Sequence, residues 1–128
     1  IGSDSHVSID VAEELRWLEY GQRLRARRRA IAPSPEALFV EAARAGARAL
    51  GQTAGVIAAG QRADLIVLDA DAPMFAGGDI ASAVDRFVVC GGPRPIRDVY
   101  VGGERVVAGG CHVAAEAVAA RYRAALAE

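Results

Sequence analysis

The chain has 128 residues, a formal net charge of −1 and 52% apolar residues. This length suits one compact domain or part of a larger one, and the apolar content excludes a disordered chain. The balanced charge gives no electrostatic reason to expect binding to nucleic acid. No stretch approaches the roughly 20 apolar residues of a membrane helix. With no signal peptide and two isolated cysteines, Cys90 and Cys111, the sequence predicts a cytoplasmic protein.

The first four residues, Ile1-Gly2-Ser3-Asp4, read like the end of a buried strand that runs into a site. A domain rarely begins in this way, so we expect a fragment or a processed chain. Asp10, with Glu13 three residues later, then forms a capping-box pattern and predicts a helix near residues 10–29. The apolar positions along its face are Val11, Leu15 and Leu18, widened by Trp17 and Leu24.

Ser34 and Pro35 begin a second predicted helix, near residues 35–50, because serine is a good N-cap and proline suits the first helical position. Gly51 stands where a left-handed residue commonly ends a helix. The apolar arc of this helix is wide and its side chains are small, so we expect it to pack closely against another surface.

After Gly51 the apolar period becomes that of strands. The predicted strands lie near residues 56–58, 65–69, 86–90, 97–101 and 104–108. The continuous apolar run Leu65–Leu68 indicates a strand covered on both faces. Gly102-Gly103 predicts a two-residue hairpin, and Gly109-Gly110 is expected to end it. Residues 81–85 are expected to form a short helical turn, and residues 114–127 a terminal helix.

The segment Ser3-Asp4-Ser5-His6 is the one place with the character of a site. Barrel enzymes place catalytic groups at the carboxyl ends of buried strands, which would make Asp4 a metal ligand and proton acceptor. The alternative is a turn or cap residue that is hydrogen-bonded to nearby backbone. His6 either lines the same pocket or is a polar residue at the start of a loop. Spacing alone leaves both alternatives open.

Residues 55–69, Gly-Val-Ile-Ala-Ala-Gly-Gln-Arg-Ala-Asp-Leu-Ile-Val-Leu-Asp, resemble a characteristic stretch of the amidohydrolase superfamily. Residues 42–51 resemble the helix that precedes this stretch there, and residues 99–106 the late hairpin. Gly2-Ser3-Asp4-Ser5 resembles the end of the last barrel strand, whose aspartate binds the metal.

This resemblance implies an α/β fold that combines the end of a metal-dependent (β/α)8 barrel with the small β-sandwich domain of the superfamily. We expect residues 1–50 to supply the last barrel strand and the following helices. Residues 51–113 would form the β-sandwich portion, and residues 114–128 the C-terminal helix.

Residues 2–8 and 13–24 are in addition similar to the formimidoylglutamate deiminases of histidine degradation, a family within that superfamily. The similarity implies hydrolysis of N-formimino-L-glutamate to N-formyl-L-glutamate and ammonia, at one divalent metal ion that is usually zinc. The metal would lower the pKa of its bound water to about 7. Asp4 would hold the metal, take the proton of the water and help to deliver it to the departing ammonia.

The chain departs from the family pattern because it lacks a His-x-His pair, and its two histidines, His6 and His112, lie far apart. Zinc sites use three or four protein ligands, so one carboxylate is not enough. We therefore expect the isolated chain to be inactive and not to bind zinc tightly. Its expected partners are the missing N-terminal barrel portion and the small-molecule substrate, whereas homodimer formation is left open. The neighbours Cys111 and His112 lack the second pair that a metal site would need.

Two alternatives remain. The chain can belong to another deaminase or amidohydrolase of the superfamily, which would share Asp4 and differ in substrate. It can instead be a free-standing, non-catalytic β-rich domain. If it is a fragment, the apolar face of residues 38–50, or that of the first helix, should be exposed or covered by a partner.

Overall fold

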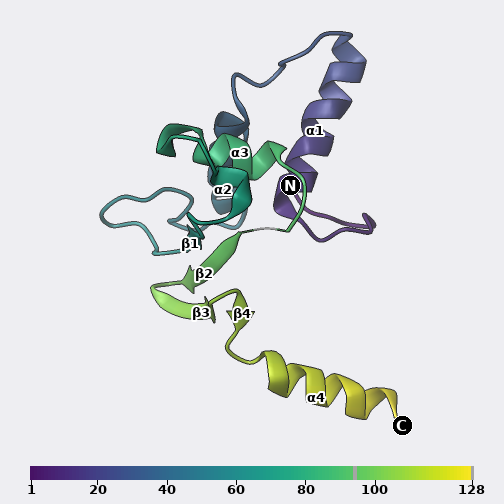
Figure 1. Ribbon diagram of the computed structural model, residues 1–128, viewed down its shortest axis with the longest axis vertical. Coiled ribbons are helices and arrows are strands. Elements are labelled where there is room, and N and C mark those ends of the chain that lie inside the picture. The colour runs from purple at the N-terminus through teal and green to yellow at the C-terminus, as the bar shows by residue number, and fades with distance from the viewer. Residues whose placement is uncertain (94, 128) are drawn as a thin grey trace.

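The computed structural model describes residues 1–93 and 95–127. In this part of the chain, three α-helices gather on one side of an antiparallel sheet, and a fourth extends beyond its far edge (Figure 1). The elements are α1 (Val11–Ala26), α2 (Pro35–Ala49), β1 (Leu65–Leu68), the 3-10 turns η1 (Pro73–Phe75) and η2 (Ile80–Ser82), α3 (Ala83–Val89), β2 (Ile96–Val101), β3 (Glu104–Ala108), β4 (Cys111–His112) and α4 (Ala115–Leu126).

The predicted helix starts are confirmed in detail. The Asp10 carboxylate accepts a hydrogen bond from the Glu13 amide at 2.9 Å, and the Ser34 hydroxyl oxygen accepts one from the Ala37 amide at 3.0 Å. Each bond satisfies one of the amides that a helix leaves unpaired in its first turn. The first helix ends at Ala26, earlier than predicted, because Arg27 takes a left-handed conformation with φ of 51°.

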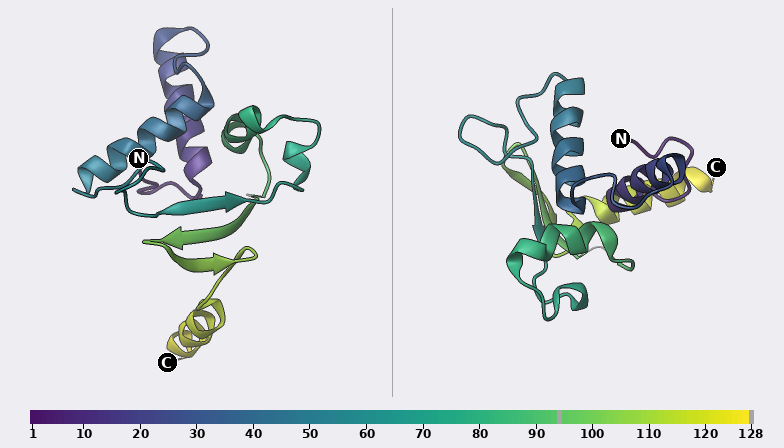
Figure 2. Two further views of the ribbon diagram at one scale, coloured as in Figure 1. Left: turned by 90° about the vertical axis from the view of Figure 1, so that its left-hand side faces the viewer. Right: turned by 90° about the horizontal axis from the view of Figure 1, so that it is seen from above.

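The sheet has the order β1-β2-β3-β4, and all its neighbours are antiparallel (Figure 2). The predicted hairpin between β2 and β3 is confirmed, and Gly102 and Gly103 both have positive φ, as its two-residue turn requires. Gly109 and Gly110 end the hairpin, as predicted, and they then turn the chain into the short strand β4, which pairs with β3. A β-sandwich, which residues 51–113 were expected to form, has two packed sheets. The described residues form a single four-stranded sheet.

The predicted strand at residues 86–90 is wrong, because Ala83–Val89 forms the helix α3. A short apolar run fits a buried helix as well as a buried strand. The signal that separates the two is the spacing of Val84, Phe87 and Val88, which lie on one helical face and pack into the core. The helical turn expected at residues 81–85 is therefore the beginning of a longer helical segment.

One further strand prediction is wrong. Residues 56–58 form no strand, and Ile57 is 89% exposed in a loop between Gly55 and Gly60, both of which have positive φ. Ile1 to Asp4 pair with none of the described residues, so their place at the end of a barrel strand, which the resemblance implies, stays a prediction. The strand predicted at residues 65–69 is confirmed over Leu65–Leu68, but its Ile66 is 41% exposed, so the strand is not covered on both faces.

The core lies where α1 crosses α3. Ala12 and Leu15 of α1 and Phe87 and Val88 of α3 are almost fully buried. Around them pack the half-buried side chains Leu38, Phe39, Ala42, Leu68, Val84 and Ile96. The ring of Phe39 meets the ring of Phe87 edge to face, with centroids 6.0 Å apart, which is a favourable aromatic geometry.

Several apolar side chains of α1 remain outside this core. Val11, Trp17, Leu18 and Leu24 are between 42% and 80% exposed. The helix α4 projects away from the other helices (Figure 1), and its Val118, Tyr122 and Leu126 are more than half exposed. Over residues 1–93 and 95–127, no helix combines the length and the apolar character that crossing a bilayer requires.

A buried carboxylate joins α1 to the segment that leads into α2. Glu19 is 9% exposed and accepts hydrogen bonds from Arg23 Nε at 2.9 Å and from the Ile31 and Ala32 amides at 3.0 Å each. The bond from Arg23 lowers the pKa of Glu19 most strongly, burial opposes the shift, and the two amides add to it. The charged form of Glu19 therefore stabilises this connection.

We predict that Glu19→Gln destabilises the fold by about 1–3 kcal/mol at neutral pH, because bonds to a buried charge are replaced by weaker ones. The pKa of Glu19 is lowered on folding, so its contribution is present above the unfolded pKa and is lost as the pH falls through the folded value. The difference between parent and variant should therefore shrink below about pH 4. Urea unfolding of parent and variant, at neutral pH and below about pH 4, measures this difference in the free energy of unfolding.

Glu41 offers a matched control, because it also pairs with an arginine of its own helix, Arg44 of α2, but its side chain is 62% exposed. Glu41→Gln should change the free energy of unfolding by less than about 0.5 kcal/mol. Equal effects of the two substitutions would show that Glu19 makes no special contribution.

Candidate functional site

Asp4 lies in a tight turn before α1. The His6 amide donates a hydrogen bond to the Ser3 carbonyl oxygen at 2.7 Å, which closes the turn. Asp4 itself has φ of 43°, a left-handed conformation that aspartate tolerates better than most residues. Its side chain is exposed, and within the described residues its carboxylate has no hydrogen-bond or ion-pair partner. The turn thus presents a carboxylate that no other described residue engages.

His6 ties this turn to α1. Its Nδ1 lies 2.8 Å from Glu14 Oε1, and its Nε2 lies 3.8 Å from Glu13 Oε1. The ring of Trp17 stands edge-on to the imidazole at a centroid distance of 6.3 Å. His6 is therefore engaged with the helix, and its side chain is 28% exposed.

The described residues do not form a metal centre by themselves. Among residues 1–93 and 95–127, no three side chains of His, Cys, Asp or Glu lie close enough together to hold a metal ion. Asp4 supplies one carboxylate, and His6 already faces Glu14. Since a catalytic zinc ion uses three protein ligands, this donor set does not fit a complete zinc site.

Cys111 and His112 have local partners. The Ala114 amide donates to His112 Nδ1 at 3.1 Å, and Cys111 Sγ lies 3.8 Å from the His112 carbonyl oxygen. Both residues are exposed, and they lie at the edge strand β4. These contacts belong to the turn between β4 and α4.

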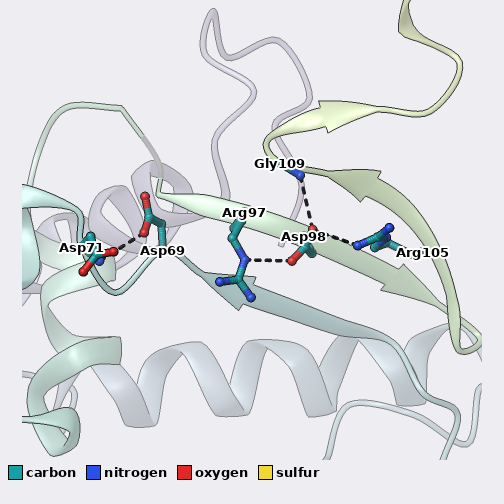
Figure 3. Close-up of polar contacts among 6 residues, drawn as sticks. All are labelled: Asp69, Asp71, Arg97, Asp98, Arg105 and Gly109. Atoms are coloured by element: carbon teal, nitrogen blue, oxygen red, sulfur yellow. Dashed lines mark hydrogen bonds and ion pairs between the residues drawn. The ribbon is translucent and has the colours of Figure 1, made fainter.

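A second carboxylate, Asp98, was not expected from the sequence. It is 7% exposed and accepts from Arg97 Nε at 2.9 Å and from the Gly109 amide at 3.3 Å, while Arg105 Nη1 lies at 3.8 Å (Figure 3). The bond from Arg97 is the main reason that the pKa of Asp98 is lowered. In the sequence, the signal for this buried carboxylate was an arginine next to an aspartate, Arg97-Asp98, in the strand before a hairpin. Because both oxygens are engaged, Asp98 fastens β2, β3 and the following turn together.

Two hollows lie away from Asp4. One, of about 290 Å³, lies between α1, the segment before α2 and the end of α3, and Arg16 and Glu19 contribute to its wall. The other, of about 780 Å³, lies between α2 and the face of β1 and β2, where Phe39, Ile66 and Val99 line it. Asp4 lines neither of these two hollows.

Comparison with known proteins places the chain in a family. Its full length is 46% identical to 30% of formimidoylglutamate deiminase from Pseudomonas aeruginosa. Its fold matches a crystal structure of an amidohydrolase from Brucella melitensis with a TM-score of 0.80 and 32% identity, over 99% of this chain and 29% of that one. The chain thus spans about a third of the length of either relative. Residues 1–106 match the Amidohydrolase family, and the chain therefore belongs to that family.

Proposed function

We propose that this chain is the carboxy-terminal portion of a longer enzyme that hydrolyses N-formimino-L-glutamate to N-formyl-L-glutamate and ammonia. The observation that carries the proposal is the 46% identity to formimidoylglutamate deiminase, which extends over the whole chain and so includes the turn with Asp4. The chain covers 30% of that relative, so most of the residues that would bind the substrate belong to the remainder.

The exposed apolar face of α1 supports a role within a larger protein. Trp17 is 58% exposed and Leu24 is 80% exposed, although both are large apolar side chains. A free-standing domain would gain stability by burying such a face, at roughly 25 cal/mol per Å² of apolar surface. We infer that this face of α1 packs against the rest of a (β/α)8 barrel.

We propose the same division of the chain that the resemblance implies. Residues 1–50 would complete the barrel, residues 51–113 would belong to a β-sandwich domain, and residues 114–128 would form the terminal helix. In this arrangement, the turn at Asp4 would lie at the carboxyl end of the last barrel strand, where barrel enzymes place their catalytic groups.

In the proposed reaction, a water molecule adds to the formimino carbon, and the tetrahedral adduct then expels ammonia. Asp4 would accept a proton from the water and return it to the departing nitrogen, which general acid–base catalysis by a carboxylate requires. Its exposed position and its lack of a partner among the described residues suit that role. We further propose that Asp4 is one ligand of a single zinc ion, whose other ligands lie outside this chain.

The first test is the activity of the longer polypeptide that contains this chain. We expect it to release one ammonia and one N-formyl-L-glutamate per N-formimino-L-glutamate, as measured by coupled ammonia detection and mass spectrometry. Formimino derivatives of aspartate and glycine serve as comparison substrates. Faster turnover of an unrelated amidine or amide would redirect the proposal to another activity of the amidohydrolase family.

The 128-residue chain alone should show neither ammonia release above a metal-only blank nor tight zinc binding. The reason is that its described residues supply no cluster of three ligands. Equilibrium dialysis with zinc, followed by the same ammonia assay, measures both properties. Turnover well above the blank would show that this chain contains a complete catalytic site.

Asp4→Asn in the longer enzyme should abolish measurable turnover and leave the melting temperature nearly unchanged. Asparagine keeps the size but cannot accept the proton, and general base catalysis typically contributes 10²–10⁴-fold. If Asp4 is only a turn residue, asparagine should replace it with little effect on activity. A kcat within tenfold of the parent would remove Asp4 from the mechanism.

A further inference from the structure

The turn that carries Asp4 is held by side-chain contacts from α1 rather than by a sheet. Among the described residues, its backbone is closed by a hydrogen bond from the His6 amide to the Ser3 carbonyl oxygen. Beyond that bond, the turn is fixed through the His6 side chain, which reaches the first turns of the helix. Because Asp4 lies in the same turn as His6, contacts that hold the His6 side chain restrict the backbone that carries Asp4.

Two neighbouring glutamates face His6, and they are not equivalent. Glu14 Oε1 lies 2.8 Å from Nδ1, a hydrogen-bonding distance, and the Glu14 side chain is 17% exposed. Glu13 Oε1 lies 3.8 Å from Nε2, beyond hydrogen-bonding distance, and the Glu13 side chain is 32% exposed. The less exposed and shorter contact is the stronger one, so Glu14 is the side chain that fixes the imidazole.

The helix itself is well placed to act as a support. Its N-terminus is capped by Asp10, and its Leu15, next to Glu14 in sequence, is fully buried in the core. Trp17 limits the tilt of the imidazole through its edge-on contact. The contacts of Glu14 and Trp17 therefore transmit the rigidity of the packed helix to an otherwise exposed turn.

We propose that Glu14 is a positioning residue for Asp4: by accepting a hydrogen bond from His6 Nδ1, it holds the turn of residues 3–6 so that the Asp4 carboxylate is correctly placed for reaction. The inference rests on the proposed function, because it gives Glu14 a role only if Asp4 acts on the substrate. It adds a residue that lies outside the reacting groups and acts through the turn.

The test uses the longer enzyme with three substitutions at the two glutamates. Glu14→Ala removes the acceptor and should lower kcat by about 10- to 100-fold, the usual cost of losing a partner that orients a catalytic group. KM should change by less than about threefold, because Glu14 does not touch the substrate. Glu14→Gln keeps an acceptor oxygen and should restore kcat to within about threefold of the parent, and Glu13→Ala should behave likewise.

Hydrogen exchange of the peptide that spans residues 1–9 supplies a readout that does not depend on activity. Glu14→Ala should speed the exchange of the His6 amide, whereas Glu13→Ala should leave it unchanged. The inference is overturned if Glu14→Ala keeps kcat within threefold of the parent. It is also overturned if Glu14→Ala and Glu13→Ala lower kcat equally and speed the exchange of the His6 amide equally. If instead Asp4→Asn remains active, the proposed role of Asp4 fails, and the inference fails with it.

Discussion

The packing of α1 against α3 is the contact on which the described structure depends. It brings Leu15 beside Phe87 and Val88, and the Arg16 side chain donates a 2.8 Å hydrogen bond to the Val88 carbonyl oxygen across 72 residues of sequence. Closing so long a loop costs conformational entropy, which the burial of these side chains must offset. Through this contact, the helix that supports the Asp4 turn is joined to the segment that leads into the sheet.

Local rules predicted much of the fold, because they depend on few neighbours. The Asp10 and Ser34 caps and the Gly102-Gly103 turn are confirmed, since each is decided by the conformation of two or three adjacent residues. Residues 86–90 were assigned wrongly because their apolar run fits either type of element. This segment packs between α1 and α2, and that environment favours a helix over a strand.

The candidate site was less accessible to prediction. Asp4 was found from its resemblance to a family pattern, and spacing alone would have left its role open. The contact between His6 and Glu14 could not be predicted, because it depends on how the turn folds back onto α1. The burial of Asp98 was missed for a similar reason, since its partners come from two strands and the turn after the second.

The carboxylates of the chain divide by what surrounds them. Glu19 and Asp98 are buried beside arginines, and each already accepts a backbone amide, so burial and these bonds hold them in structural roles. Asp4 is exposed and has no hydrogen-bond or ion-pair partner among the described residues. A carboxylate left free in this way retains the acceptor capacity that proton transfer needs.

The place of β1 at the edge of the sheet affects how the chain behaves in solution. Within the described residues, β1 pairs only with β2, so one row of backbone amides and carbonyls along Leu65–Leu68 has no strand beside it. Its side chains are all apolar, and it contains neither the proline nor the charge with which natural proteins protect such edges. Its length of four residues is what limits strand addition here, because a second copy could form few backbone hydrogen bonds along so short an edge.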